Sequence, residues 1–419
     1  MVTRPIKIIV IGGGAAGFFG AIAASEKGAK VTLLETARKP LAKVRISGGG
    51  RCNVTHACFD PNLLIQNYPR GGNALRGAFS RFQPQHTIAW FESRGVKLKT
   101  EADGRMFPVS DNSETIVQCL TDRAESLGID IRTGVAVRSL KRFTKEFTDD
   151  REFGVELQTG EVLTCDRLLL ATGSHPSGYA MAQSLGHEII KPLPSLFTFN
   201  IIDPRLEGLA GLSSEFVKIK LLDSAKKVDR NLEQMGAVLI THWGLSGPAV
   251  LKLSAWGARM LGERHYQAHI QINWLPELST EVVRSQLISA KTELAQRLIT
   301  GHCGFKQIPK RLWQSLLVAS AIDNSRRWAD ISKPQINQLL IELTQGNYTI
   351  TGKGIFKEEF VTCGGVNLKE VEFKTMESRK CANLYLAGEI LDIDGVTGGF
   401  NFQSAWTTGW LAGQAMADP

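Results

Sequence analysis

The chain has 419 residues with ordinary hydrophobic content, and its 49 Lys or Arg against 41 Asp or Glu give a formal net charge of +8. This composition excludes a disordered or fibrous chain and predicts two or three packed domains. No apolar stretch approaches the roughly 18 residues that span a bilayer, and no signal-peptide pattern surrounds the first apolar run, so we expect a cytoplasmic protein without membrane contact.

The first predicted strand, residues 6–11, ends in a cluster of glycines that opens an Ala-rich helix. Gly12, Gly14 and Gly17 form the G-x-G-x-x-G pattern in its required context, between a strand and a helix. Gly12 permits a tight turn, Gly14 lets a pyrophosphate approach the backbone, and Gly17 lets the helix pack against the strand. The free N–H groups of the first helical turn then face the phosphates.

A second predicted strand, residues 30–35, ends in Glu35. Folds of this kind place an acid about 20 residues beyond the glycine turn, where it binds ribose hydroxyls. A chance glycine-rich loop does not account for Glu35. The sequence therefore predicts a dinucleotide-binding site.

Three consecutive glycines, residues 48–50, follow Ser47. Such a run cannot form the interior of a stable helix or strand. We expect a loop pressed against a flat or anionic ligand rather than a flexible linker, because Arg51 and Asn53 add ordered polar donors. Five basic residues lie near this loop: Arg38, Lys39, Lys43, Arg45 and Arg51. They would offset the charge of a diphosphate, so the basic composition does not require a nucleic-acid partner, and none is expected.

With these motifs the chain resembles the HI0933-like flavoprotein family, also called YhiN- or BaiN-like and labelled aminoacetone-oxidase-like. Two further motifs carry the resemblance, Gly-Arg-Met-Phe-Pro at 104–108 and Thr-His-Trp-Gly-Leu-Ser-Gly-Pro at 241–248. The resemblance covers essentially the whole chain and implies FAD as the cofactor. One departure is the short loop at 174–179, which in relatives is longer and lies on the substrate side.

The next segments alternate between helix and strand. Apolar residues at helical spacing predict a helix over 113–127, and strands follow near 129–140 and 153–164. The resemblance implies that the backbone around Val137 meets the adenine. A further strand ends in Ala-Thr-Gly at Gly173, as in flavoproteins with two dinucleotide-binding motifs.

From about residue 190 the pattern changes. Pro192 and Pro194 indicate a linker, and alternating runs such as 216–222 predict a small antiparallel β-domain. Three helices are then predicted over 279–345, the first of them reaching Leu298. These helices bear a group of basic and aromatic residues that fits either an RNA-binding patch or, as we favour, a solvated face with core tryptophans: Lys306, Lys310, Arg311, Trp313, Arg326, Arg327 and Trp328.

The last segment returns to the cofactor. A buried-strand run over 383–389 ends in Gly388 and Glu389, and a glycine-led helix follows from Gly399 to about residue 415. Because helix N-termini favour anions, the amides at its start would stabilise negative charge on a reduced flavin. Both ends of the chain therefore build one domain.

The predicted fold class is α/β. A Rossmann-like FAD-binding domain of the two-dinucleotide-binding flavoprotein type comprises residues 1–190 and 355–419. A β-barrel-like domain, 191–276 with 346–354, is inserted in it, as the resemblance implies, and a small helical cap domain spans 277–345. The residues expected to bind the cofactor lie in the glycine turns and strand ends described above: Gly12, Gly14, Ala15, Ala16, Gly17, Glu35, Thr36, Lys43, Ser47, Gly48, Gly49, Gly50, Arg51, Cys52, Asn53, Val137, Ala171, Thr172, Gly173, Gly388, Glu389, Gly399, Phe400, Asn401 and Phe402.

Candidates for catalysis are few. Cys52 lies in the glycine loop, but a free cysteine is more often a small buried residue. Arg105 and His242 are the other candidates, and histidine is the side-chain type suited to acid–base work. The seven cysteines form no C-x-x-C pair and fit reduced thiols, and no cluster has metal-ligand spacing, so no metal is expected.

The function predicted is that of an FAD-dependent oxidoreductase acting on an unidentified small organic substrate. Only one glycine fingerprint is present, so a dedicated nicotinamide domain is not expected, while NAD(P)H as a transient donor stays open. The alternatives are an FAD protein that binds tRNA or another nucleic acid, and a non-catalytic flavin electron carrier. The oligomeric state is not predicted.

Overall fold

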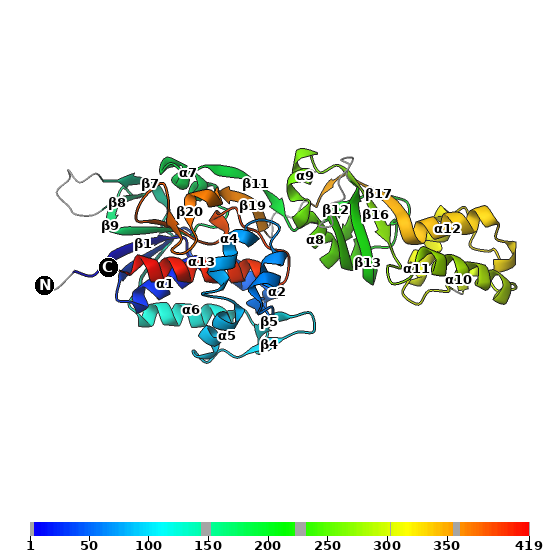
Figure 1. Ribbon diagram of the computed structural model, residues 1–419, viewed down its shortest axis with the longest axis horizontal. Helices are drawn as coiled ribbons and strands as arrows, with labels where there is room; N and C mark the ends of the chain where they lie inside the picture. The colour runs from blue at the N-terminus through cyan, green and yellow to red at the C-terminus, as the bar shows by residue number, and fades with distance from the viewer. Residues whose placement is uncertain (1–3, 144–151, 223–231, 302, 355–360, 419) are drawn as a thin grey trace. The chain divides into compact units, whose positions relative to one another are not determined.

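The computed structural model describes residues 4–143, 152–222, 232–301, 303–354 and 361–418. Contacts divide the chain into two compact units (Figure 1). Unit 1 contains Met1–Pro192 and Thr362–Pro419, and unit 2 contains Leu193–Val361. The boundary that we predicted at 354/355 adjoins residues outside the described part of the chain.

Unit 1 is organised by a seven-stranded sheet of order β20–β21–β22–β10–β1–β2–β6. Five neighbouring strands run parallel, and their buried positions are Val, Ile and Leu except for Thr32 and Tyr385, as expected for a sheet covered on both faces. Two short antiparallel strands complete one edge. The strands are β1 (Lys7–Ile11), β2 (Lys30–Glu35), β6 (Asp130–Thr133), β10 (Arg167–Leu170), β20 (Val371–Glu372), β21 (Glu377–Ser378) and β22 (Leu384–Leu386). The parallel sheet confirms the predicted α/β Rossmann-type fold.

Two helices from opposite ends of the chain, α1 (Ala15–Glu26) and α13 (Phe400–Met416), pack side by side (Figure 1). A Cβ on Gly409 would overlap the carbonyl oxygen of Ala16, and one on Gly413 would overlap that of Gly20. The helices therefore touch backbone to backbone, and only glycine fits at these positions of α13.

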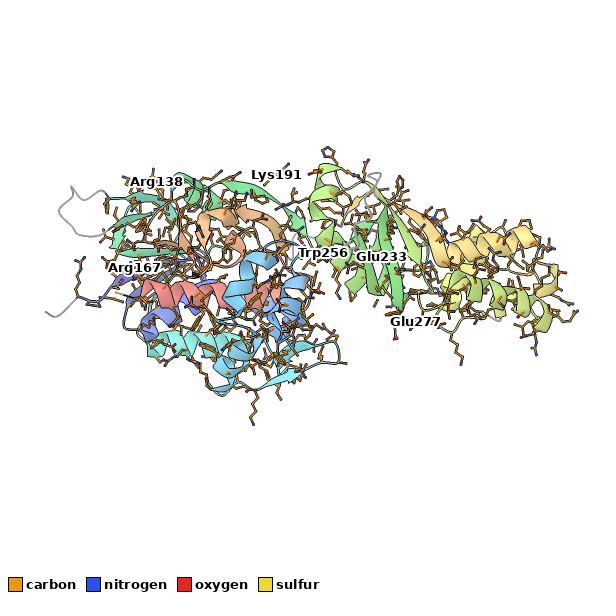
Figure 2. All side chains as sticks on the ribbon, viewed as in Figure 1. Arg138, Arg167, Lys191, Glu233, Trp256 and Glu277 are labelled. Carbon is orange, nitrogen blue, oxygen red and sulfur yellow. The ribbon has the colours of Figure 1, made fainter. Side chains whose placement is uncertain are left out.

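The C-terminal end of α13 is held by an arginine from the sheet. Arg167, on β10, donates hydrogen bonds to the carbonyl oxygens of Ala415 (3.2 Å) and Met416 (2.7 Å) (Figure 2). A guanidinium satisfies the last carbonyls of a helix and interacts favourably with its dipole. The sheet thus fixes the position of α13 along its axis.

The other elements of unit 1 surround this core. The predicted helix at 113–127 is confirmed as α6 (Glu114–Ser126). The strands expected near 129–140 and 153–164 are β6 and a three-stranded antiparallel sheet of β7 (Val137–Arg142), β8 (Phe153–Leu157) and β9 (Val162–Cys165). The remaining elements are α2 (Ala42–Gly50), β3 (Thr55–His56), α3 (Pro61–Leu64), η1 (Ile65–Asn67), α4 (Gly72–Phe79), α5 (Pro84–Glu92), β4 (Leu98–Thr100), β5 (Arg105–Pro108), α7 (Pro176–Ser184), β11 (Ile189–Ser195, continuing into unit 2), β19 (Val361–Val366), η5 (Leu368–Glu370) and η6 (Gly388–Ile390).

Unit 2 contains an antiparallel sheet of order β17–β16–β13–β14–β15–β12–β18. Val217, Ile219 and Leu221 of β13 are buried while Lys218 and Lys220 are not, as the alternation predicts. No pairing among the described residues joins β17 to β18, so a closed barrel is not confirmed. The strands are β12 (Phe199–Asn200), β13 (Ser213–Leu222), β14 (Glu233–Thr241), β15 (Gly244–Ser246), β16 (Ala268–Asn273), β17 (Gly346–Ile350) and β18 (Gly352–Lys353).

Unit 2 also contains the predicted helices, with two corrections. The first helix ends at Glu293 rather than at Leu298, because the chain turns there to pair Leu298 with Arg327. Pro309 precedes its helix as the N-cap instead of lying in the first turn. The helices are α8 (Pro248–Trp256), α9 (Ala258–Glu263), α10 (Thr280–Glu293), η3 (Ile299–Gly301), α11 (Lys310–Ala319), η4 (Trp328–Asp330) and α12 (Lys333–Gln345).

The segment predicted as a proline-marked linker is a strand. Pro192 and Pro194 lie in β11, which within the described residues forms a two-stranded sheet with β19. Proline is tolerated on such an edge because its missing N–H faces no partner strand. Among the described helices, none combines the length and apolarity needed to cross a membrane.

Replacing Gly409 with Ala should destabilise unit 1, because the added Cβ pushes α13 away from α1. We expect a loss of about 1–3 kcal/mol in the free energy of unfolding, measured in urea. Gly77→Ala on α4 is the matched control, since its Cβ would meet no atom within 4 Å. The control should be neutral or stabilise by about 0.5–1 kcal/mol. Equal urea midpoints for Gly409→Ala and the wild type would contradict the packing argument.

Candidate functional site

The turn between β1 and α1 shows three different reasons for glycine. Gly12 has φ +110°, and a Cβ there would overlap the Ala171 carbonyl oxygen. A Cβ on Gly17 would overlap the carbonyl oxygen of Gly12. Gly14 has φ −91°, which any residue adopts, and its Cβ would meet no atom within 4 Å. No protein contact requires glycine at position 14, whereas close approach of a pyrophosphate does.

Glu35 ends β2 beside this turn. Its carboxylate accepts hydrogen bonds from the N–H groups of Gly13 (2.6 Å) and Ala37 (2.7 Å). Its carbonyl oxygen accepts from Val135 (2.9 Å), so the segment leading into β7 and Val137 lies next to the acid. Glu35 is thereby fixed at the end of β2, where a ribose is expected.

The glycine loop departs from helical geometry at the residues where the sequence predicts a loop. Ser47 has ψ 151°, and Gly48 and Gly49 have φ of 58° and 70°, although a helical segment that we did not predict precedes them in α2. A Cβ on Gly49 or Gly50 would meet no atom within 4 Å, so this part of the loop is open on its outer side.

Asn53 ties the glycine loop to the start of α13. With its amide oriented to satisfy its neighbours, it donates to the carbonyl oxygen of Thr55 (3.0 Å) and accepts from the N–H of Gly399 (2.9 Å). Gly399 has φ +90° and is the N-cap of α13. Two predicted binding segments that are far apart in sequence thus form one structure.

Charged residues around the loop are paired within the protein. Lys43 forms an ion pair with Glu389. Arg51 pairs with Glu101 (2.6 Å) and lies 4.0 Å above the centre of the Phe107 ring. Arg51 stays a predicted cofactor contact, and in the structure its guanidinium also binds Glu101 and Phe107.

A segment that sequence reasoning missed lies beside Glu389. The N–H of Thr362 donates to Glu389 (3.0 Å), and the N–H of Gly364 donates to Asp392 (3.0 Å). Gly364 and Gly365 both have positive φ and approach neighbouring carbonyl groups too closely for a side chain. A glycine pair after the run Val361-Thr362-Cys363 was the signal in the sequence.

The N-terminus of α13 is supported from several sides. Tyr68 donates to the carbonyl oxygen of Phe400 (2.7 Å), and the Asn401 amide accepts from the N–H of Gly395 (2.8 Å) and donates to its carbonyl oxygen (2.9 Å). The buried Asp394 pairs with Arg70 nearby. By helix geometry the first N–H groups, those of Phe400, Asn401 and Phe402, have no intrahelical acceptor.

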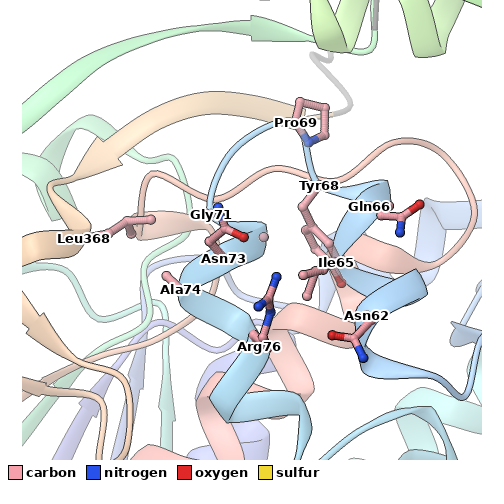
Figure 3. Close-up of a pocket in the computed structure, with 11 residues that line it drawn as sticks. Asn62, Ile65, Gln66, Tyr68, Pro69, Gly71, Asn73, Ala74, Arg76 and Leu368 are labelled. Carbon is pink, nitrogen blue, oxygen red and sulfur yellow. The ribbon is translucent and has the colours of Figure 1, made fainter. Parts of the chain in front are cut away.

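A cavity of about 580 Å³ opens beside Tyr68, but it is not the predicted cofactor site (Figure 3). None of the residues predicted to bind the cofactor lines it. Its lining combines polar side chains from η1, α3 and α4 with two aliphatic residues: Asn62, Gln66, Asn73 and Arg76, with Ile65 and Leu368.

Tyr179, on α7, is a second group that the sequence reasoning left out. Its hydroxyl is buried and has no hydrogen-bond partner among the described residues. Burial raises the pKa of Tyr179, and the nearby carboxylates of Glu389 and Asp392 raise it further, so the phenol stays protonated at neutral pH. Thr172, in the Ala-Thr-Gly strand end, also has a buried hydroxyl oxygen without a partner in the described structure. Orphaned donors beside Glu389 fit a polar group bound at this place.

The candidate catalytic residues are not brought together as one constellation. Cys52 is fully buried, and burial raises its pKa to about 12, so it is not a thiolate at neutral pH. This environment opposes a redox role. Arg105 pairs with Glu101 and Asp103 in unit 1. His242 lies exposed between β14 and β15 of unit 2.

Four features define a Rossmann-type FAD-binding flavoprotein, and the residues present fit this cofactor. They are the strand–glycine turn–helix, the acid on β2, the open glycine loop and the glycine-led α13. The family model described as "HI0933-like protein Rossmann domain" matches residues 6–415. The chain belongs to this family, which confirms the resemblance seen in the sequence.

Three curated relatives cover nearly the whole chain. The 3-dehydro-bile acid delta(4,6)-reductase of Clostridium scindens is 31% identical over 98% of this chain and 99% of its own. The ribosomal RNA dihydrouridine synthase of Escherichia coli is 30% identical over 97% of both chains. The protein of the same name from Haemophilus influenzae is 29% identical over 98% of both.

Replacing Gly14 with Val should abolish cofactor binding without unfolding the protein, because the side chain fills the space meant for a diphosphate. We expect the Kd for FAD, measured by flavin fluorescence, to rise at least about tenfold, or about 1.4 kcal/mol. The melting temperature of the FAD-free protein should stay unchanged. Gly17→Val is the contrast, since its side chain overlaps Gly12 and should unfold unit 1. Unchanged FAD affinity in Gly14→Val would refute this site.

Replacing Tyr179 with Phe tests the orphaned hydroxyl. FAD binding should weaken by about 1 kcal/mol, the usual net value of a hydrogen bond, while the FAD-free protein should be as stable as the wild type or more so. Titration calorimetry with FAD measures the first effect and thermal unfolding the second. Tyr348→Phe, a buried tyrosine of unit 2, is the control and should bind FAD normally. Identical FAD affinity in Tyr179→Phe and the control would remove this role.

Proposed function

We propose that this protein is an FAD-dependent oxidoreductase that adds hydrogen across a carbon–carbon double bond conjugated to a carbonyl group. The observation that carries the proposal is that relatives with two different names, each matched over nearly the whole chain, have this reaction in common. The Δ4,6 double bonds of a 3-dehydro bile acid are conjugated to its ketone. The double bond lost when uridine becomes dihydrouridine is conjugated to a uracil carbonyl.

Bound FAD, once reduced by a nicotinamide donor, would supply the hydride, and the chain supplies binding, orientation and electrostatics. The first turn of α1, with its open Gly14, is suited to a diphosphate, and Glu35 to ribose hydroxyls. The N-terminus of α13 is suited to negative charge, because its first N–H groups have no helical acceptor. The protonated phenol of Tyr179 provides a hydrogen-bond donor in the same unit.

We propose NADH or NADPH as a donor that binds transiently, because the chain carries a single glycine fingerprint with its acid. Two substrate classes follow from the relatives. One is a small enone of steroid type, and the other is a uracil base in RNA. The short loop at 174–179 separates this chain from the family pattern on the substrate side, so neither class is carried over directly.

An anaerobic titration tests the proposal. The flavin absorbance of the purified protein should be bleached by NADH or NADPH and should return when an electron-accepting substrate is added. A bile-acid-type dienone and an RNA transcript containing uridines are the first two substrates, with mass spectrometry detecting the added hydrogens. The Gly14→Val protein is the control and should show neither step.

The outcomes separate the candidate functions. Reoxidation by one substrate, with reduced product, supports the reductase and identifies its class. Reversible bleaching with no product from either substrate would instead support an electron carrier. A preparation that lacks flavin and takes up no added FAD would overturn the proposal altogether.

A further inference from the structure

The strongest unassigned feature is a surface of basic residues in unit 2. Between residues 294 and 332 the chain has six Lys or Arg and two Asp, so this stretch carries a net charge of +4, half of the charge of the whole chain. All six side chains are exposed, and five of them form no ion pair between described residues; we call these five the Arg326 surface: Arg297, Lys306, Lys310, Arg326 and Arg327. The sixth, Arg311, donates to the carbonyl oxygen of Gly208 and is held by the protein.

Backbone pairing brings the three arginines together. The segment after α10 runs antiparallel to the segment before η4, with a bridge between Leu298 and Arg327. The N–H of Ile299 donates to the carbonyl oxygen of Arg326 (3.0 Å), and the N–H of Trp328 donates to that of Arg297 (3.1 Å). Arg297 therefore lies beside Arg326 and Arg327, although about 30 residues separate them in sequence.

A buried aromatic core lies under this surface. Trp313 and Trp328 are fully buried, with ring centres 6.3 Å apart, and Phe305 packs against Trp313. The indole N–H of Trp313 donates to the carbonyl oxygen of Ile299 (2.9 Å). The tryptophans are thus structural, as the solvated-face interpretation predicted, and they fix the loops that bear Lys306 and the arginines.

The basic groups are not neutralised locally. None of the ion pairs between described residues involves a member of the Arg326 surface. Asp323 accepts hydrogen bonds from Ser325, which lower the pKa of its carboxyl group. The charge of Arg326 lowers this pKa further, but Arg326 forms no ion pair with Asp323 within the described residues. Arg327 donates to the neutral Gln296 (2.9 Å). Holding an excess of like charges together raises the free energy of the isolated protein, and a bound polyanion lowers it.

We propose that the Arg326 surface docks the phosphate backbone of RNA. This inference rests on the proposed function and chooses, of its two substrate classes, the uracil base in RNA. Arginine fits the partner because its planar guanidinium binds a phosphate through two parallel hydrogen bonds. Because the tryptophans are buried and not available for stacking on bases, the surface binds the charged phosphates and does not distinguish base sequence.

The test removes three charges at a time. The variant Arg297→Gln/Arg326→Gln/Arg327→Gln alters the docking surface, and Lys97→Gln/Lys369→Gln/Lys374→Gln removes three exposed charges from unit 1. Binding of a labelled single-stranded RNA of about 16 nucleotides is followed by fluorescence anisotropy at about 50 mM and about 200 mM KCl. Wild type should bind, with affinity that falls steeply with salt.

The arginine triple variant should bind RNA at least tenfold more weakly at low salt. Its slope of log affinity against log salt should be shallower by about 2, since each lost phosphate contact removes about 0.7–0.9. The lysine triple variant should remain within about twofold of wild type and keep the slope. FAD content and melting temperature should be unchanged in both variants.

Three results would overturn the proposal: no RNA binding by wild type, equal losses in both variants, or binding to phosphatidylserine vesicles but not to RNA. Bleaching of the flavin by NAD(P)H and reduction of the dienone and of the uridines in RNA are measured on the same proteins. If the flavin is not bleached, or if neither substrate is reduced, in all of them, the proposed function fails. If bleaching and reduction of either substrate persist while the arginine variant binds RNA like wild type or wild type does not bind it, only the docking surface is refuted.

Discussion

The backbone contact between α1 and α13 is the constraint on which unit 1 depends. Helices ordinarily pack with side chains between them, at interaxial distances of about 8–10 Å, whereas Gly409 and Gly413 here admit the backbone of Ala16 and Gly20. This approach places the N-terminus of α13 next to the glycine loop, where Asn53 joins the two. The cofactor site is therefore a product of helix packing as much as of local motifs.

The glycines of this chain are required for different physical reasons, and comparing these reasons indicates where a ligand lies. Gly17 is required by a neighbouring carbonyl, and Gly12 by its φ as well. Neither a neighbouring carbonyl group nor a positive φ requires glycine at position 14, so a ligand rather than a protein contact accounts for Gly14. Tyr179 points to a ligand in the same way, because its buried hydroxyl has no acceptor among the described residues, which fits a bound partner.

Much of the fold could be predicted because its signals are local. The β1 turn, Glu35, the helix α6 and the alternation of β13 all follow from spacing along the chain. Three features depend on segments that are distant in sequence, so no local pattern predicts them. They are the prolines in β11, the early end of α10 and the pairing of Arg51 with Glu101. The same holds for Tyr179, whose unpaired hydroxyl is visible only once its neighbours are placed.

The packing of α1 against α13 also sets an order of events when the protein is made. About 370 residues separate the end of α1 at Glu26 from the start of α13 at Phe400. At 5–20 residues per second, a ribosome needs roughly 20–75 s to synthesise that interval. During this time one face of α1 has no helix to cover it. Unit 2, whose chain is continuous, is free to fold first.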